Sequence, residues 1–143
     1  METRTLNNGV EMPQEGFGVF QVSDPALMKE LGVQPQAWAP FAEGLKGMFA
    51  EPVFAEIAAK HGKTPAQVIL RWNVQQGVIV IPKSVHKERM KENLEIWDFT
   101  LDEDDMRRIE TLDLGQPFML DTRKLSEIRR VYDYLKNPVL TSL

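Results

Sequence analysis

Apolar positions along the chain fall into two patterns, short continuous runs and longer stretches with helical spacing. Residues 78–81, Val-Ile-Val-Ile, form a β-branched run that is typical of a parallel strand buried on both faces. An apolar run predicts a second strand over residues 33–39, and alternating glycines and large apolar residues predict a third over 16–22. Residues 5–12 predict a hairpin that turns at Asn8-Gly9, because an Asn-Gly pair favours the positive φ angles of a tight turn.

Helical spacing separates these strands, and the region from 43 to 50 is predicted as a loop. Polar caps and glycines set the expected ends of the helices. Two residue pairs have the spacing of capping boxes, Thr64 with Gln67 and Thr100 with Glu103. The helices are predicted after Ser23-Asp24-Pro25 and over about 52–60, 65–76, 87–97, 103–112 and 123–134.

Strands that alternate with helices predict an α/β fold with parallel strands. The sequence predicts about three strands and five or six helices, and three parallel strands cannot close into a barrel. In the helix predicted over 87–97, Met90, Leu94 and Trp97 form an apolar stripe, while Arg89, Glu92 and Asn93 share another face at i, i+3 and i+4.

Composition narrows the classes of function. The chain has 143 residues and a net charge of −4, so it carries no overall basic field that would attract nucleic acid. It has no cysteine, which excludes disulfides, thiolate metal sites and cysteine nucleophiles. The N-terminus lacks the apolar core of a signal peptide, and no apolar run approaches the roughly 18 residues of a membrane span. We therefore expect a cytoplasmic protein that binds neither nucleic acid nor membrane.

The candidate chemistry lies where the 78–81 strand ends. Lys83 places a cation at the strand tip, and Ser84 offers a hydroxyl and a backbone N–H. Arg89 can stack on a purine or pair with a phosphate, and Glu92 and Asn93 can bind the amino edge of an adenine. In α/β barrels the loops after the last two strands commonly bind phosphate at a helix N-terminus. These residues predict a site for a phosphorylated adenosine.

The string from Ile81 to Asn93, Ile-Pro-Lys-Ser-Val-His-Lys-Glu-Arg-Met-Lys-Glu-Asn, resembles the eighth strand and following helix of the aldo-keto reductase family. Residues 63–68 and 70–72 resemble the family before that strand, and Gly18-Val19-Phe20 resembles its first strand. The resemblance implies a (β/α)8 TIM barrel and NADP as cofactor. It implies cofactor-binding roles for Trp38, Gly44, Lys83, Ser84, Val85, His86, Arg89, Glu92 and Asn93, and a substrate-binding role for Phe20.

In that family the lysine and serine bind the 2′-phosphate, the arginine stacks on the adenine, and the glutamate and asparagine bind the adenine edge. Trp38 resembles the aromatic residue under the nicotinamide, although a core role is the alternative. Phe20 fits either the core or the substrate pocket, and His86 fits either the cofactor phosphate or a solvated loop. His61 is interpreted as a helix end, Asp121 and Arg123 as a surface pair, and the acidic run 102–105 as charge that complements a helix dipole and not as a metal site.

The resemblance covers the first strand and then the seventh strand onward. A full barrel needs about 250 residues. The family's catalytic aspartate, tyrosine, lysine and histidine lie in its second to fourth strands, and none can be placed in this sequence. We therefore predict a single incomplete barrel domain over residues 1–143. Its hairpin and first strand occupy 1–26, its cofactor-binding part occupies 27–143, and a junction lies near 26–28. The missing part is either deleted or belongs to a longer chain.

The expected fold is thus α/β, a partial TIM barrel with an N-terminal hairpin, strands that correspond to the first, seventh and eighth, and C-terminal helices. The expected function is NADP(H)-dependent reduction of aldehydes or ketones, with the cofactor-binding part present and no turnover by the 143 residues alone. The alternative is a catalytically inactive fragment that binds a partner or self-associates through its open strand edges. The substrate, the oligomeric state and a strict preference for NADP over NAD do not follow from the sequence.

Overall fold

The computed structural model describes residues 2–14, 30–32, 34–115, 121 and 123–136. These belong to two compact units, residues 1–33 and 34–143. The strand predicted over 16–22 with Phe20, most of the helix predicted after Ser23, and the proposed junction near 26–28 lie outside the described residues.

The first unit contains the predicted hairpin. Strands β1 (Thr3–Thr5) and β2 (Glu11–Pro13) pair in antiparallel register, with Arg4 opposite Met12. Gly9 has a φ of +83°, and the amide of Leu6 donates to the carbonyl of Val10 at 2.8 Å. The prediction of a turn at Asn8-Gly9 is confirmed, because only a residue that tolerates positive φ closes this turn without strain.

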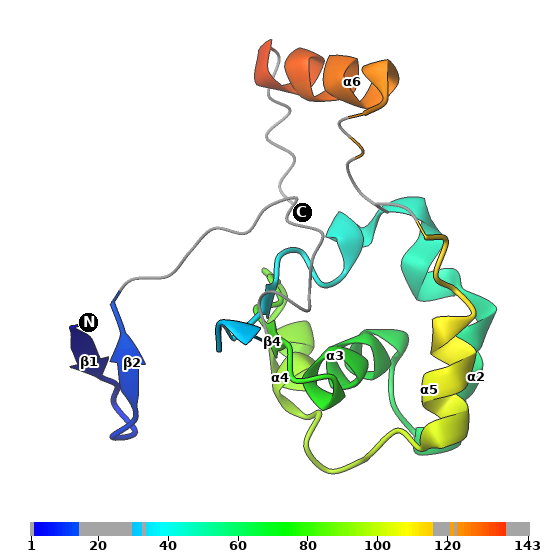
Figure 1. Ribbon diagram of the computed structural model, residues 1–143. Helices are drawn as coiled ribbons and strands as arrows, with labels where there is room; N and C mark the ends of the chain where they lie inside the picture. The colour runs from blue at the N-terminus through cyan, green and yellow to red at the C-terminus, as the bar shows by residue number, and fades with distance from the viewer. Residues whose placement is uncertain (1, 15–29, 33, 116–120, 122, 137–143) are drawn as a thin grey trace. The chain divides into compact units, whose positions relative to one another are not determined.

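The second unit contains a parallel pair of short strands and a set of helices (Figure 1). Strand β3 (Gln36–Ala37) pairs with β4 (Ile79–Val80), with Gln36 opposite Ile79. The described residues therefore form an α/β arrangement with few strands and no closed barrel. The helical elements are η1 (Ala42–Ala50), a 3₁₀ helix, and the α-helices α2 (Pro52–His61), α3 (Pro65–Gln75), α4 (Lys87–Leu94), α5 (Glu103–Glu110) and α6 (Leu125–Lys136).

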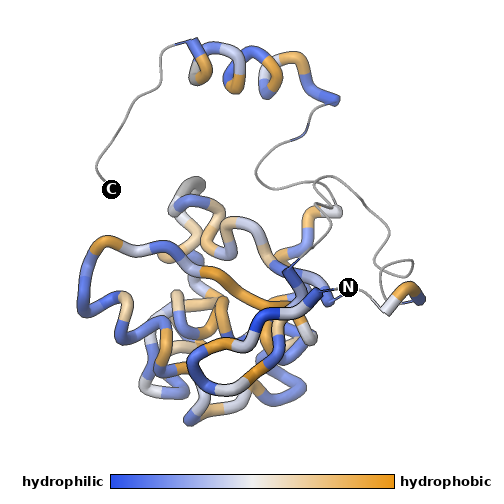
Figure 2. The backbone as a smooth tube through the Cα atoms, turned by 90° about the vertical axis from the view of Figure 1, so that its left-hand side faces the viewer, coloured by the Kyte–Doolittle hydropathy of each residue, from blue (hydrophilic) through white to orange (hydrophobic). Residues whose placement is uncertain are grey.

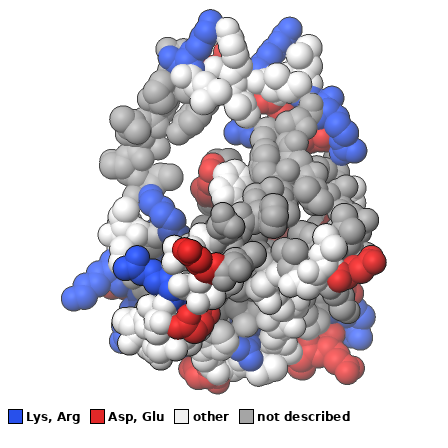
Figure 3. Space-filling view, turned by 60° about the vertical axis from the view of Figure 1, so that its left-hand side comes forward, with Lys and Arg blue, Asp and Glu red and all other residues white. Residues whose placement is uncertain are grey.

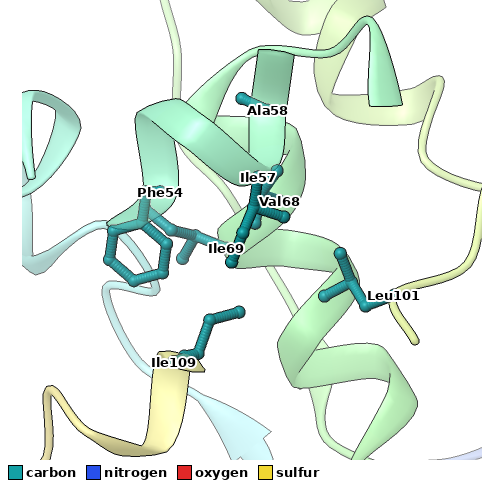
Figure 4. Packing of buried hydrophobic residues seen from close by; sticks show 7 residues of the cluster. All are labelled: Phe54, Ile57, Ala58, Val68, Ile69, Leu101 and Ile109. Atoms are coloured by element: carbon teal, nitrogen blue, oxygen red, sulfur yellow. The ribbon is translucent and has the colours of Figure 1, made fainter. Parts of the chain in front are cut away.

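The hydrophobic core lies among α2, α3 and the segment that includes α5 (Figure 4). Ile57 of α2 and Val68 of α3 are completely buried, as the helical spacing predicts. Burying side chains of this size stabilises the fold by roughly 1.5–3 kcal/mol each. The other buried members of this cluster are Phe54, Ala58, Ile69, Leu101 and Ile109.

Two capping boxes begin helices, one where it was predicted and one two residues later. The Thr64 hydroxyl accepts from the Gln67 amide at 3.3 Å, and Gln67 accepts from the Thr64 amide at 3.0 Å, so the first prediction is confirmed. The second box uses Asp102 and Asp105, and the prediction of Thr100 with Glu103 is wrong. The Thr100 hydroxyl instead accepts a hydrogen bond from Arg71 at 3.1 Å, and carboxylates make equally good caps.

Three other expectations are corrected. The predicted loop over 43–50 is the 3₁₀ helix η1, and α4 ends at Leu94, short of Trp97. The strand predicted to be buried on both faces is not: Ile79 and Ile81 are 42% and 63% exposed. The apolar stripe of α4 is also exposed, with Leu94 at 73%. Among the described residues β4 pairs on one side only, with β3, so its other edge has no neighbouring strand.

The tube in Figure 2 shows apolar and polar residues in alternation along α6, the helix drawn at the top. In α6, Leu125, Ile128, Tyr132 and Leu135 follow helical spacing on one face, and all four are exposed. Within the described ranges, no helix combines the length and the apolarity needed to cross a membrane.

Candidate cofactor-binding site

The parallel pairing of β3 and β4 brings two loops to the same edge of the sheet. Because Ala37 pairs with Val80 in parallel register, both strands end at one level. The chain continues from β3 into residues 38–41 and from β4 into residues 81–86. Trp38, which follows β3, and Lys83 and Ser84, which follow β4, therefore lie after neighbouring strand ends. The carboxyl ends of parallel strands are where α/β proteins commonly bind ligands.

These loops line an open hollow of about 900 Å³. Its wall is made by the segment from β3 into η1, by the start of α3, and by the segment from Ile81 into α4. Every described residue that the sequence assigns to the cofactor lies on this one hollow. They are Trp38, Gly44, Lys83, Ser84, Val85, His86, Arg89, Glu92 and Asn93.

The backbone before η1 is unusual. Ala39, Ala42 and Glu43 have φ angles of +49°, +48° and +56°, and Gly44 follows at +71°. Side chains with a Cβ rarely adopt this region, at a cost of roughly 1–2 kcal/mol each. A Cβ on Gly44 would stand 3.7 Å from the Phe49 ring, an ordinary contact, so the backbone angle and not the space favours glycine there. Such strain concentrates at ligand sites.

Part of the hollow was missed from the sequence. Phe41 and Phe49 pack with ring centroids 5.4 Å apart and add an aromatic wall next to Trp38. The first turn of α3, residues 64–66, forms another part of the lining. The glycines at 44 and 47 near these aromatic residues are the available signal; the resemblance assigns Gly44 to the cofactor but neither phenylalanine.

The loop after β4 leads directly into α4. The Ser84 hydroxyl accepts a hydrogen bond from the His86 amide at 3.1 Å, which turns the chain toward the helix. His86 is the N-cap residue and makes no side-chain capping bond, so the first-turn amides of α4 are available to an anion. Lys83 and Arg89 are exposed cations on the same hollow, whereas Glu92 and Asn93 are half-buried. Figure 3 shows acidic and basic side chains together on the face that it draws.

A second polar cluster holds α2 against α5. Asp105 is completely buried, with Lys60 Nζ at 2.8 Å and His61 Nε2 at 2.7 Å from its two carboxylate oxygens. Burial raises the pKa of Asp105, but hydrogen bonds from Lys60, His61 and the Asp102 amide outweigh it, so the pKa lies below its ordinary value. His61 ends α2 as predicted, but its contact with Asp105 was not foreseen.

The predicted pair of Asp121 and Arg123 is present, with Arg123 Nε donating to the carboxylate at 2.7 Å. The aspartate is not a surface residue, however, because its side chain is only 7% exposed. The arginine is the first cause of a lowered pKa at Asp121. Among the described residues, no three side chains of the metal-binding types gather in one place.

Comparisons with known proteins match a part of the chain that includes the β4 and α4 side of this hollow. Residues 46–114 match the family model described as the aldo/keto reductase family. The chain is 46% identical over 84 residues to methylglyoxal reductase DkgA of Escherichia coli strain K12, which covers 59% of this chain and 30% of that protein. It is 45% identical over 85 residues to 9,11-endoperoxide prostaglandin H2 reductase of Trypanosoma cruzi, again 59% and 30%.

Solved structures give the same match. The chain resembles MGS-M4, an aldo-keto reductase from a deep-sea metagenome library, with a TM-score of 0.63 and 34% identity over 70% of this chain and 37% of that one. It also resembles a mutant of Gox0644 in complex with NADPH, with a TM-score of 0.60 and 37% identity over 65% and 34%. This chain therefore spans about a third of the length of these relatives. Over the stretch that the family model matches, residues 46–114, the chain belongs to the aldo/keto reductase family.

Proposed function

We propose that this chain carries the NADP(H)-binding part of a reductase that converts aldehydes or ketones to alcohols. The observation that supports the proposal most directly is that the nine residues assigned to the cofactor line one hollow. The relatives named as reductases, and the neighbour whose structure holds NADPH, are consistent with it. When bound, the cofactor would supply a hydride to the substrate carbonyl.

The chemistry of the hollow suits the parts of NADP(H). Lys83, Ser84, Arg89 and the first-turn amides of α4 offer a set of cations and donors for a 2′-phosphate. Arg89 also presents a planar face for an adenine, whose amino edge Glu92 and Asn93 can bind.

The opposite wall of the hollow suits the other half of the cofactor. Trp38 and the strained loop before Gly44 are the proposed supports for the nicotinamide and the pyrophosphate, with Val85 and His86 beside the phosphate end. For Phe20 we retain a proposed role in the substrate pocket. We also propose a cytoplasmic location, with which a chain without cysteine is compatible.

The first test is a titration of the 143-residue chain with NADPH, followed by cofactor fluorescence and by calorimetry. We expect saturable binding with one site per chain, and no NADPH-dependent reduction of methylglyoxal, since no proton-donating set can be placed in the chain. Absence of binding at millimolar NADPH would overturn the cofactor role. Turnover that is lost on mutating a residue of this chain would overturn the expectation of inactivity.

A second candidate function is a module that binds a partner or a second copy of itself. The exposure of apolar side chains after β4 and at the end of α4 favours it: Ile81, Leu94 and Trp97 are each more than 60% exposed. Exposed apolar side chains that form a patch commonly mark interaction sites. In that case the hollow would keep some nucleotide affinity or none, and the apolar surface would carry the function.

We expect the chain to associate with itself at micromolar concentrations, as measured by sedimentation velocity over a hundredfold range of protein. Replacing Leu94 and Trp97 with lysine should shift the distribution toward monomer, because each substitution puts a charge in place of an exposed apolar side chain. Leu114→Lys is the control, since Leu114 is 64% exposed and lies on neither β4 nor α4. A monodisperse monomer at every concentration would contradict this expectation.

A further inference from the structure

One buried amide joins the ends of two helices beside the hollow. Gln67, in the first turn of α3, is only 5% exposed. Its Nε2 donates to the carbonyl oxygens of Glu92 at 3.1 Å and Glu95 at 3.0 Å. Its Oε1 accepts from the amide of Thr64 at 3.0 Å and lies 3.3 Å from the Thr64 hydroxyl. Both hydrogens of the amide and its oxygen are therefore engaged, and every partner belongs to a helix end.

The two carbonyls lie at the C-terminal end of α4, where most helix carbonyls lack a partner in a following turn. The Glu92 carbonyl already accepts from the Glu95 amide at 3.0 Å, and Gln67 adds a second donor from another helix. The Glu95 carbonyl accepts from Gln67 at 3.0 Å, and Lys63 Nζ adds a longer contact of 3.4 Å. Packing constrains α4 little, because Met90 and Leu94 are 46% and 73% exposed and no residue of the helix is fully buried. The orientation of α4 about its axis therefore depends strongly on this polar contact.

We infer that Gln67 is a positioning residue for the nucleotide, acting by holding α4 so that Glu92 and Asn93 face the hollow. The inference rests on the proposed function and extends it to a side chain that the hollow does not contact. Glu92 links Gln67 to the hollow directly, because Gln67 donates to its carbonyl while the Glu92 residue lines the hollow. Neighbouring residues 64–66 line the same hollow, so the contact also fixes the distance between two of its walls.

The decisive substitution is Gln67→Glu. Glutamate keeps the acceptor that the capping box of α3 needs, because Thr-x-x-Glu is itself a good capping box. It loses both donors and directs a carboxylate at the two carbonyl oxygens of α4. Gln75→Glu is a matched control on the same helix: Gln75 donates to the Leu101 carbonyl at 3.0 Å and accepts from its amide at 2.8 Å, away from the hollow. Gln67→Met is a second variant that removes the donors without adding a charge, although it also removes the oxygen that accepts from the Thr64 amide.

The readout is the preference for NADPH over its hypoxanthine analogue, in which a carbonyl oxygen replaces the adenine amino group. We expect the wild-type chain and Gln75→Glu to prefer NADPH by about tenfold, which corresponds to one lost hydrogen bond of about 1.4 kcal/mol. In Gln67→Glu and Gln67→Met the preference for NADPH should fall to about twofold or less, because Glu92 and Asn93 are no longer positioned to bind the adenine edge. A preference that is unchanged in both Gln67 variants would overturn the inference.

Hydrogen exchange keeps this test separate from the test of the proposed function. Amides of residues 90–95 should exchange at least tenfold faster in both Gln67 variants than in the wild type, and at the wild-type rate in Gln75→Glu. If the wild-type chain binds no NADPH, the proposed function and this role in nucleotide binding both fail, and faster exchange would then show only that Gln67 holds α4. If the wild type binds and exchange in α4 is unchanged in the variants, the inference alone fails.

Discussion

Replacing Arg89 with alanine should weaken binding of NADPH by about 10- to 100-fold, while binding of NADH weakens by only a few-fold. Arg89 is exposed on the hollow, close to the end where Lys83 and Ser84 lie. A hydrogen-bonded pair with a charged group contributes about 1.5–3 kcal/mol, and a 2′-phosphate is the group that distinguishes the two cofactors. Parallel calorimetric titrations with both cofactors measure the difference.

Arg107→Ala serves as the matched control, because Arg107 is an exposed arginine of α5 that pairs with Asp104 and does not line the hollow. This variant should bind both cofactors as the wild type does. Equal losses for NADPH and NADH in Arg89→Ala would argue that the guanidinium stacks on the adenine but does not bind a 2′-phosphate. No loss for either cofactor would place the nucleotide elsewhere.

Replacing Asp105 with alanine should lower the free energy of unfolding by about 3 kcal/mol, the largest effect expected of a single polar substitution among the described residues. Its carboxylate is completely buried and accepts from Lys60, while it also contacts His61 Nε2 and serves the capping box of α5. The substitution leaves the half-buried His61 without this partner and weakens the contact between α2 and α5. Urea unfolding at pH 7, followed by circular dichroism, measures the loss.

The pH dependence follows from the direction of the pKa shift. The pKa of Asp105 is lower in the folded chain, so its contribution is fully present above the ordinary carboxyl range and is lost as pH falls through the folded value. Asp102 acts in the same direction, since the hydrogen bond from Lys60 lowers its pKa to about 2.

We therefore expect the stability of the wild type to fall below about pH 4, and to fall less steeply in Asp105→Ala. Asp104→Ala is the control, because Asp104 is exposed and pairs only with Arg107 among the described contacts. Parallel slopes in the wild type and Asp105→Ala between pH 5 and pH 2 would contradict this assignment.

The parts of the fold that were predicted correctly depend on nearby residues. The hairpin turn at Gly9, the capping box of Thr64 with Gln67, and the end of α2 at Gly62 each follow from local geometry, because φ angles and caps involve only a few neighbours. The second capping box shows the limit of such reasoning. Thr100 and Asp102 are both residue types that cap helices well. The Thr100 hydroxyl accepts a hydrogen bond from Arg71, 29 residues earlier in the chain, and Asp102 caps the helix instead.

The candidate site could be predicted as a set of residues but not as a surface. The spacing of Arg89, Glu92 and Asn93 along one helix follows from the sequence. Their meeting with Trp38 and Gly44 depends on the parallel pairing of β3 with β4, a contact between residues more than 40 positions apart. The positive φ angles at Ala39, Ala42 and Glu43 could not be foreseen, because alanine and glutamate give no local signal for that conformation.

The sequence alone determined the periodicity of the helices, most of their ends, and the polar residues after β4 that resemble a nucleotide-binding loop. Tertiary structure alone decided which apolar residues are buried: Ile57 and Val68 are enclosed, while Ile81 and Leu94, equally apolar, are exposed. It also gave Gln67 and Asp105 their partners across helices. The physical reason is that a periodic pattern specifies which side of an element is apolar, whereas burial and long-range hydrogen bonds require a second element to lie against that side.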